Sequence, residues 1–340
     1  MKILIKNLLL MSLIFGALTW LPSRAQAKSS AVILMYHRFG ETEFPSTNTR
    51  LKQFEKHIEE LTNGSYTVLP VKKIIAAIQN GKELPDKTVG ITIDDGYRSV
   101  FTEALPRLKK AGLPFTVFIA TAQIDRNASK YMSWDQIRAL KKNGVEIGAH
   151  TSTHHHMPTS SERRNNAELE NSNARMKKEL GAASDMFAYP FGEASLSVQK
   201  LIRKKGYKMA FGQHSGVVNK STNLNFIPRF ALNENYGDLN RLRLVLNALA
   251  LPTQDITPAD TLIGKTNPPD FGFTVASSVK NLHRLSCFSS SKGRVRVELL
   301  GPRIEVRMTS AFPKGRTRIN CTLPGPENRW HWFGTLFVVP

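Results

Sequence analysis

The strongest constraint on this fold is a regular alternation, from Ala31 to about Leu251, of short apolar runs and longer amphipathic segments. Strands that alternate with helices build a parallel sheet on which the helices pack. An open doubly wound sheet and a closed (β/α) barrel both fit, and both place functional groups at the carboxyl ends of the strands. The predicted strands span 31–36, 89–93, 115–120, 145–149, 186–189 and 208–211. The predicted helices span 51–61, 71–79, 99–111, 133–142, 161–180 and 195–205.

The segment from Ser133 to Ala149 carries the clearest start and stop signals for a helix. Ser133 is a good N-cap residue, and Gln136 stands at the third helical position, where its side chain can complete a capping box. Asn143 and Gly144 are typical of a helix end. The segment is therefore predicted to be a helix followed by a strand.

The alternation of apolar and amphipathic segments ends after Leu251, where prolines interrupt a stretch without amphipathic periodicity. Residues 294–299 and 303–308 alternate apolar and polar side chains around Gly301 and Pro302, which predicts a β-hairpin. We therefore expect a main domain over residues 28–255 and a small, basic, β-rich domain over residues 256–340.

The N-terminal residues resemble an export signal. Lys2 and Lys6 precede the apolar stretch 8–21, and Ala25-Gln26-Ala27 has the small-x-small pattern of a signal peptidase site. Residues 1–27 are thus predicted to be a signal peptide of a periplasmic or secreted protein, with a retained membrane anchor as the alternative. In an oxidising compartment Cys287 and Cys321 could form one disulfide.

The chain is strongly basic, with a formal net charge of +20. In a cytoplasmic protein this charge would suggest nucleic acid as a partner, but an export signal directs the expectation to anionic lipid or acidic polymer instead. No nucleic-acid partner is expected. Peripheral association with an anionic envelope surface and an ordinary solvated basic surface are both compatible with this composition.

Two polar motifs follow predicted strands. Asp94 and Asp95 come directly after the apolar run 89–93, and His150 and His154 follow the run 145–149. Either motif alone is common in turns or on surfaces. Together at strand ends, however, they predict a metal site with histidine and carboxylate ligands and a second carboxylate free to act as a base.

These motifs resemble those of the polysaccharide deacetylase family with NodB homology, carbohydrate esterase family 4. The run 92–96, Thr-Ile-Asp-Asp-Gly, is similar to its first motif, and 150–154, His-Thr-Ser-Thr-His, to its second. The run 187–192, Phe-Ala-Tyr-Pro-Phe-Gly, is similar to its third motif. The resemblance covers roughly residues 30–240 and implies a distorted (β/α) barrel. The C-terminal segment is similar to the tail of a subgroup of exported proteobacterial members.

The resemblance also implies a role for each matched residue. Asp95, His150 and His154 would bind a divalent metal, usually zinc, and Asp94 would be the general base. The backbone N–H of Phe191 would stabilise the oxyanion of the tetrahedral intermediate.

Two family residues are missing from their usual places. Many members have an arginine in the third motif where this chain has Ala188, and Arg229 is our candidate for the missing partner of Asp94. The Leu-x-Leu-His motif near the end of the domain, whose histidine usually acts as the general acid in this family, is absent as well. His37, which ends the first predicted strand, is the candidate general acid, as in a circularly permuted branch of the family. A purely structural role is the alternative for both residues.

Other residues near the motifs are weaker candidates. His155 is the alternative metal ligand to His154. The candidate substrate contacts are Tyr97, Trp134, Tyr189, Pro190 and His214, although packing in the core is the common fate of such aromatic side chains.

The sequence thus predicts an exported, metal-dependent hydrolase. It would remove acetyl groups from N-acetylglucosamine units of an envelope or extracellular polysaccharide, or of a chitooligosaccharide. A deacetylase of a small N-acetylated amine and a non-catalytic glycan-binding protein are the alternatives. No oligomeric state is predicted.

Overall fold

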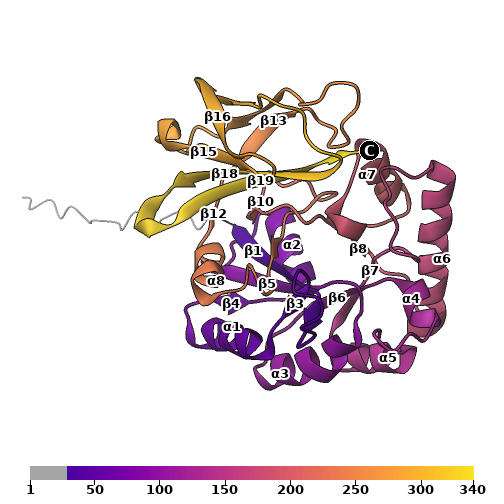
Figure 1. The fold of residues 1–340 in the computed structure, drawn as a ribbon. Coiled ribbons are helices and arrows are strands. Elements are labelled where there is room, and N and C mark those ends of the chain that lie inside the picture. The colour runs from indigo at the N-terminus through magenta and orange to yellow at the C-terminus, as the bar shows by residue number, and fades with distance from the viewer. Residues whose placement is uncertain (1–28) are drawn as a thin grey trace, which may run out of the picture.

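The structure, a computed structural model, describes residues 29–340, and the predicted signal peptide lies outside this range. Figure 1 shows two units, a sheet surrounded by helices and a second, β-rich unit drawn in orange and yellow above it. Within the described range no helix is long and apolar enough to span a membrane.

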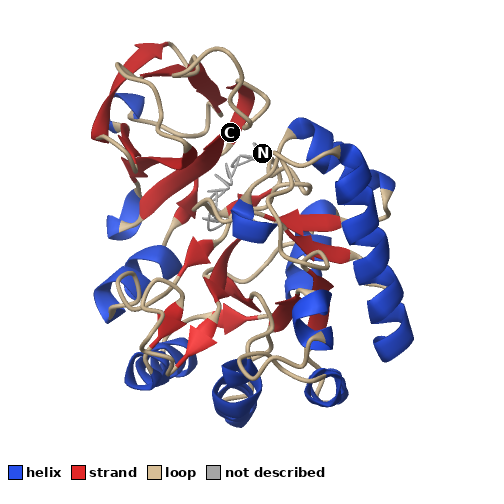
Figure 2. Ribbon diagram, turned by 45° about the vertical axis from the view of Figure 1, so that its right-hand side comes forward, coloured by secondary structure: helices blue, strands red, loops and turns tan. Residues whose placement is uncertain are grey.

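A curled nine-stranded sheet forms the first unit, in the order β10-β1-β5-β6-β7-β8-β9, with β11 and β4 pairing β1 and β5. The strands from β1 to β9 in this order are parallel, as predicted. Their apolar side chains are almost fully buried, because helices cover the sheet from outside (Figure 2). The strands on this path are β1 (Ser30–Tyr36), β5 (Thr88–Ile93), β6 (Thr116–Ile119), β7 (Glu146–Ala149), β8 (Met186–Ala188), β9 (Met209–Phe211) and β10 (Val218–Asn219).

The six predicted helices are present. Ser133 and Gln136 form the expected capping box at the start of α5. The predicted helix at 99–111 consists of a π-helical turn (Val100–Ala104) that continues into α3. The helices are α1 (Leu51–Asn63), α2 (Val71–Gln79), α3 (Leu105–Lys110), α5 (Trp134–Lys142), α6 (Glu162–Leu180) and α7 (Leu196–Lys204).

One short segment joins the two edges of this sheet and closes it into a distorted barrel. Ile227 pairs with Phe211 of β9, and β11 (Phe230–Ala231) pairs with β1 in parallel. Arg229 stands between these two pairings, and its side chain is fully buried. The closing segment therefore carries a charged side chain into the barrel.

Several short elements were not predicted. They have too few residues to show a periodic pattern, or, like α8, lie where the sequence gives no strong helix signal. These elements are β2 (Arg38–Phe39), β3 (Asn48–Thr49), β4 (Thr67–Val68), α4 (Thr121–Asp125) and α8 (Leu239–Leu246).

The second unit is a separate eight-stranded sheet in the order β12-β19-β18-β15-β16-β17-β14-β13, with its own apolar core. Its strands lie on both sides of the expected domain boundary at 255, because β12 and most of β13 precede it. All neighbouring strands are antiparallel except β12 and β19. The strands are β12 (Leu249–Ala250), β13 (Thr253–Thr257), β14 (Phe271–Val275), β15 (Ser286–Ser289), β16 (Gly293–Leu300), β17 (Arg303–Arg307), β18 (Gly315–Pro324) and β19 (Trp330–Val339).

Two local predictions for this sheet are confirmed. The hairpin is formed by β16 and β17, which turn at Gly301 and Pro302. Cys287 of β15 lies opposite Cys321 of β18, and the two are joined by a disulfide.

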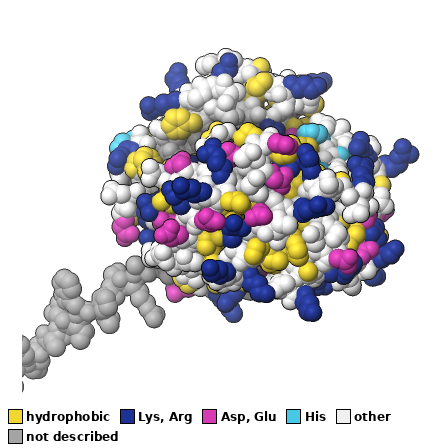
Figure 3. All heavy atoms as spheres, turned by 60° about the horizontal axis from the view of Figure 1, so that its bottom comes forward, with side chains coloured by type: hydrophobic (Ala, Val, Ile, Leu, Met, Phe, Trp, Pro, Cys, Tyr) yellow, Lys and Arg dark blue, Asp and Glu magenta, His cyan; other side chains and the backbone are white. Residues whose placement is uncertain are grey.

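The surface charge is dispersed on the face in Figure 3. Lys and Arg side chains are spread over this face, and Asp and Glu side chains lie among them. Several arginines of the second sheet also pair with acidic neighbours, such as Arg296 with Glu298 and Arg303 with Glu305. The positive charge of the chain therefore does not gather into one patch on this face.

Candidate metal centre

The two sequence motifs meet at the carboxyl end of the parallel sheet. Asp94 and Asp95 directly follow β5, and His150 directly follows β7, with β6 between these strands. Because the strands are parallel, all three side chains reach the same end of the barrel.

Asp95, His150 and His154 form the one cluster of potential metal ligands found within residues 29–340, with ligand atoms within 4.8 Å of one another. The Nε2 atoms of His150 and His154 lie 3.2 and 3.3 Å from Oδ1 of Asp95. Burial opposes the charge on Asp95, but the two imidazoles outweigh burial and hold the pKa of Asp95 well below its usual value. The carboxylate is therefore ionised, as a metal ligand must be.

The donor set fits a divalent metal. The Oδ1 atom of Asp95 and the Nε2 atom of His150 are buried without a hydrogen-bond partner. Nδ1 of His150 lies 2.7 Å from the carbonyl oxygen of Ala188 and donates to it, so Nε2 is the ring nitrogen that would bind a metal. Two imidazoles and one carboxylate are a common ligand set for catalytic zinc.

Asp94 is not part of this cluster and pairs instead with Arg229. The guanidinium donates to both carboxylate oxygens, at 2.8 and 2.7 Å, and both side chains are fully buried. Arg229 also donates to the carbonyl oxygen of Gly212 and to the hydroxyl of Thr92. Burial by itself raises the pKa of Asp94, but Arg229 lowers it below its usual value. The contact expected from the sequence is thus present.

His37 follows β1 and lies within electrostatic reach of both carboxylates. Burial lowers the pKa of His37, and the negative charges of Asp95 and Asp94 oppose that effect in part. The structure therefore brings this predicted residue to the same end of the barrel as the ligand cluster.

The loop after β7 is fixed by helix α6. The Glu168 carboxylate accepts hydrogen bonds from the N–H groups of Ser152 and Thr153 and from the Thr153 hydroxyl. Burial alone would raise the pKa of Glu168, but His155 and Thr153 lower it to about 2. Glu168 is therefore a fixed negative charge that holds the loop carrying His154.

The same helix removes His155 from the ligand set. Nε2 of His155 lies 2.7 Å from Oδ1 of Asn165, and Nδ1 lies 3.6 Å from Glu168. Because both ring nitrogens face α6, the alternative ligand predicted from the sequence is wrong, and His154 occupies the position beside Asp95.

Four non-glycine residues at this site have left-handed backbone conformations. They are Asp95, Thr151, His154 and Phe191, with φ values of 74°, 63°, 60° and 59°. Such conformations are unfavourable for residues with a side chain and persist where the surrounding structure enforces them. Their concentration around one cluster indicates a built site.

Phe191 lies on a short turn between β8 and α7. The N–H groups of Gly192 and Glu193 donate to the carbonyl oxygens of Tyr189 and Pro190. Among residues 29–340, none accepts the N–H of Phe191. The ring of Phe191 packs edge-on against His154, with centroids 4.4 Å apart. The Phe191 side chain therefore lies beside His154 of the ligand cluster.

A small pocket of about 130 Å³ adjoins the cluster. Tyr97 is the one predicted substrate contact among its lining residues, and burial and the nearby Asp95 raise the pKa of its hydroxyl. The pocket is lined by Asp95, Tyr97, Ala120, Gln123, Tyr131, Thr153 and His154.

Tyr189 and Pro190 are buried in the core. Tyr189 is fully buried, and its hydroxyl donates to the carbonyl oxygen of Asn225. Pro190 is also buried. Neither side chain can stack on a sugar ring, so their prediction as substrate contacts is wrong.

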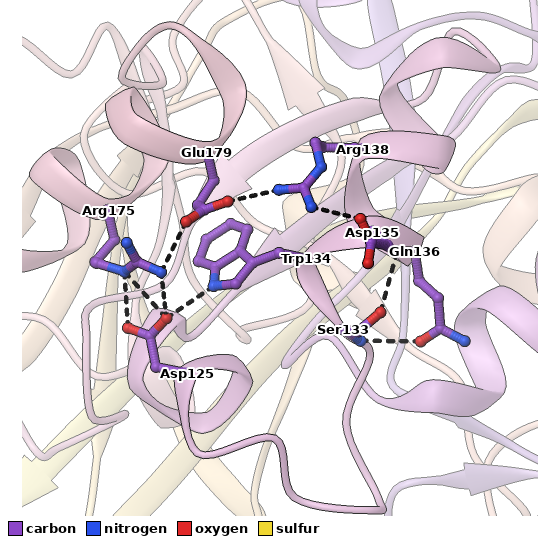
Figure 4. A network of polar contacts seen from close by, with 8 residues as sticks. All are labelled: Asp125, Ser133, Trp134, Asp135, Gln136, Arg138, Arg175 and Glu179. Carbon is purple, nitrogen blue, oxygen red and sulfur yellow. Dashed lines mark hydrogen bonds and ion pairs between the residues drawn. The ribbon is translucent and has the colours of Figure 1, made fainter.

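Trp134 and His214 lie outside the small pocket. The indole N–H of Trp134 donates to Asp125, and the Arg175 guanidinium lies over the ring (Figure 4). His214 lines a separate cavity of about 290 Å³ between the two sheets, where burial lowers its pKa to about 3. Both were predicted as substrate contacts. Trp134 instead contacts Asp125 and Arg175, and His214 lines a different cavity, so neither lines the pocket beside Asp95.

Sequence reasoning missed Glu168, Tyr131 and Arg316. In the sequence, Glu168 cannot be distinguished from the other charged residues of the long helix α6. Only the structure shows that its carboxylate contacts the loop after β7. Tyr131 comes shortly before the Ser133 cap, and its ring packs 4.9 Å from that of Tyr97. Arg316 lies in the second sheet and donates to the carbonyl oxygen of Phe191.

Comparisons with known proteins agree with this site. Residues 81–210, which hold both carboxylates and both histidines, match the family model described as polysaccharide deacetylase. YxkH of Bacillus subtilis is 26% identical over 201 residues, which cover 59% of this chain and 70% of that protein. The poly-beta-1,6-N-acetyl-D-glucosamine N-deacetylase of Staphylococcus aureus is 25% identical over 233 residues, covering 61% of this chain and 80% of that protein.

A solved structure shares the fold. The Streptococcus pyogenes deacetylase PplD, determined in complex with acetate, superposes with a TM-score of 0.60 at 20% identity and covers 64% of this chain and 99% of its own. The barrel, the sequence matches and the Asp-His-His cluster agree: the part of the chain that holds the cluster, residues 81–210, matches the polysaccharide deacetylase family.

Proposed function

We propose that this protein hydrolyses the acetamido group of N-acetylglucosamine units in an envelope or extracellular polysaccharide or chitooligosaccharide, releasing acetate and leaving a free amine. The observation that carries this proposal is the separation of the two adjacent carboxylates. Asp95 faces two imidazoles, whereas Asp94 is held by Arg229. A ligand and a base side by side are what metal-dependent amide hydrolysis requires.

Asp95, His150 and His154 would hold the metal, which we propose to be zinc. A divalent metal in this position supplies Lewis-acid chemistry, since it polarises a carbonyl and makes water more acidic. His150 is oriented for this task by the Ala188 carbonyl, and the loop of His154 by Glu168.

Asp94 is the proposed general base. Arg229 keeps the carboxylate ionised and fixes its orientation, and each carboxylate oxygen retains lone-pair capacity beyond the single bond from Arg229. An ionised, oriented carboxylate next to the ligand cluster can accept a proton from the attacking water.

Two further groups complete the proposed reaction. The unpaired N–H of Phe191 donates to the oxyanion that forms when water adds to the amide carbonyl. His37 donates a proton to the nitrogen as the carbon–nitrogen bond breaks, so that the sugar leaves as a neutral amine. The pocket of about 130 Å³ beside Asp95 is the proposed position of the acetyl group.

The export of the chain belongs to this proposal. The Cys287–Cys321 disulfide suits an oxidising compartment. We place residues 28–255 as the catalytic domain and residues 256–340 as the small basic β-rich domain of a periplasmic or secreted enzyme, with β12 and the start of β13 extending from the first range into the second sheet. An N-acetylated glycan outside the cytoplasm is its proposed partner.

The decisive experiment measures acetate released from several acetylated substrates by purified residues 28–340. The substrates are chitooligosaccharides, poly-N-acetylglucosamine, peptidoglycan and acetylated polyamines, each with and without chelator. We expect chelator-sensitive release from a glycan, with Asp94→Asn retaining metal without turnover and His150→Ala losing the metal. Release from the polyamines alone would identify a small-molecule enzyme instead. No chelator-sensitive release from any substrate would refute the proposal.

A further inference from the structure

The C-terminal sheet and its connections form hydrogen bonds with the segment that follows β8 and contains Phe191. Arg316 of β18 donates from Nη1 to the carbonyl oxygen of Phe191 at 3.0 Å. Further along, the Thr261 hydroxyl donates to the carbonyl oxygen of Ala194 at 2.6 Å, and the N–H of Leu196 donates to Asp260 at 3.1 Å. Polar groups of the second sheet and its connections thus hold this segment at several successive positions.

Arg316 makes a second contact that the proposed reaction does not use. Its Nε lies 3.7 Å from the carboxylate of Glu193, which is only 3% exposed. The same carboxylate accepts from Nδ1 of His156 at 2.7 Å. A buried carboxylate without partners is strongly unfavourable, so Glu193 ties Arg316 to the loop that carries His154 and His156.

The ring of Phe191 lies among the same groups. His156 stacks on it with centroids 3.9 Å apart and planes 5° apart. His154 meets the ring edge-on, and the Arg316 guanidinium lies 5.6 Å from its centroid. Phe191 therefore contacts a metal-ligand candidate on one loop and an arginine of the other sheet.

We propose that Arg316 is a positioning residue for the deacetylation reaction, through which the C-terminal sheet fixes the Phe191–Glu193 segment and aims the Phe191 N–H at the reacting carbonyl. This inference rests on the proposed function. It gives the second sheet a task at the catalytic centre rather than a separate binding role.

The turn at Phe191 needs contacts from outside because Phe191 has a left-handed φ of 59°. A phenylalanine favours other backbone conformations, so the turn relaxes unless outside contacts hold it. An oxyanion donor displaced by about 1 Å loses much of its effect, on the order of 100-fold in rate. Arginine suits this position because one planar group can reach a carbonyl and a carboxylate together, which lysine cannot do equally well.

The test uses the full chain without its signal peptide and compares Arg316→Ala and Arg316→Lys with the wild type. Arg296→Ala is the matched control, since that arginine lies in the same sheet with its side chain 74% exposed. The measurements are kcat and KM for the preferred acetylated glycan, zinc affinity, and amide hydrogen exchange of the peptide covering residues 190–196.

We expect Arg316→Ala to lower kcat by roughly 10- to 100-fold with KM and zinc affinity nearly unchanged, because substrate and metal contacts remain. The amides of Gly192 and Glu193 should exchange faster, Arg316→Lys should recover part of kcat, and Arg296→Ala should match the wild type. Wild-type kcat and unchanged exchange in Arg316→Ala would overturn the inference.

Failure of the proposed function gives a different result. A wild-type protein that releases no acetate refutes deacetylation, and the exchange of residues 190–196 still decides whether Arg316 holds the segment. If Arg316→Ala does not fold, Arg316→Gln provides the same comparison, because glutamine can still donate to the Phe191 carbonyl but cannot pair with the charge of Glu193.

Discussion

Replacement of Arg229 by methionine isolates the contribution of the buried ion pair to stability. Methionine fills much of the same space without charge. The variant leaves the Asp94 carboxylate fully buried without its cation and also removes the donors to Gly212 and Thr92. We expect the free energy of unfolding to fall by about 3–5 kcal/mol, the usual penalty for removing one partner of a buried pair.

A double variant tests whether the expected loss in the free energy of unfolding comes from the buried charge of Asp94. Most of the penalty comes from the uncompensated charge, so neutralising that charge should restore stability. The double variant Asp94→Asn with Arg229→Met should therefore be more stable than Arg229→Met alone, although it has two changes instead of one. Such non-additivity is expected only for residues in direct contact.

The assay is urea unfolding at pH 7 in the presence of chelator, followed by circular dichroism for the wild type, both single variants and the double variant. Chelator is needed because a bound metal would stabilise the folded state by mass action. An unchanged m-value shows that the same surface unfolds in each protein. The reasoning is refuted if Arg229→Met lies within about 1 kcal/mol of the wild type, or if the double variant shows the sum of the single penalties.

Two other changes test other parts of the structure. The pKa of Glu168 is lowered to about 2 from an ordinary value of 4.5, so its stabilising effect is present above pH 4.5 and is lost as the pH falls toward 2. The stability difference between the wild type and Glu168→Gln, measured by urea unfolding with chelator, should therefore begin to shrink below about pH 4.5 and continue to shrink as the pH falls toward 2. A constant difference would contradict the role given to this carboxylate. Replacing Cys287 and Cys321 by alanine opens a loop with a sequence separation of 34 residues, which should destabilise the second sheet by about 3–4 kcal/mol. Thermal unfolding of the oxidised wild type and the double variant measures this effect, and equal transitions would show that the bond adds no stability.

The main sheet could be predicted because its buried strands appear in the sequence as short apolar runs. The run 31–36 is apolar throughout and 89–93 nearly so, and strong caps such as Ser133 mark the helices that alternate with such runs. The closure of the barrel leaves no such run in the sequence. It depends on Ile227 and on the two-residue strand Phe230–Ala231, which are too short for any periodic signal.

The second sheet was predicted only in part, although its longest strands carry a readable pattern. Thr317, Ile319, Cys321 and Leu323 alternate with more exposed residues along β18, and each is buried. That alternation is the mark of a half-buried strand. The hairpin of β16 and β17 was found because Gly301 and Pro302 separate two alternating runs that pair with each other.

The candidate site was predictable where its residues are adjacent in sequence and unpredictable where they meet across the fold. Asp94 and Asp95 share one motif, and family resemblance assigns them different roles. The choice between His154 and His155 needed the structure, since it depends on which ring faces α6. Tyr189 was wrongly placed because a motif shows that a residue belongs to a site but not which way its side chain points.

The left-handed residues of the site set a limit on how far this protein can be stabilised. Thr151 is β-branched and fully buried at φ 63°, and its hydroxyl accepts the N–H of His154. Glycine at this position would relieve the backbone but would remove that acceptor. Selection for heat resistance should therefore favour substitutions at positions such as Thr151 and Phe191 that weaken catalysis, so evolution toward higher temperature and evolution toward faster turnover would pull these residues in opposite directions.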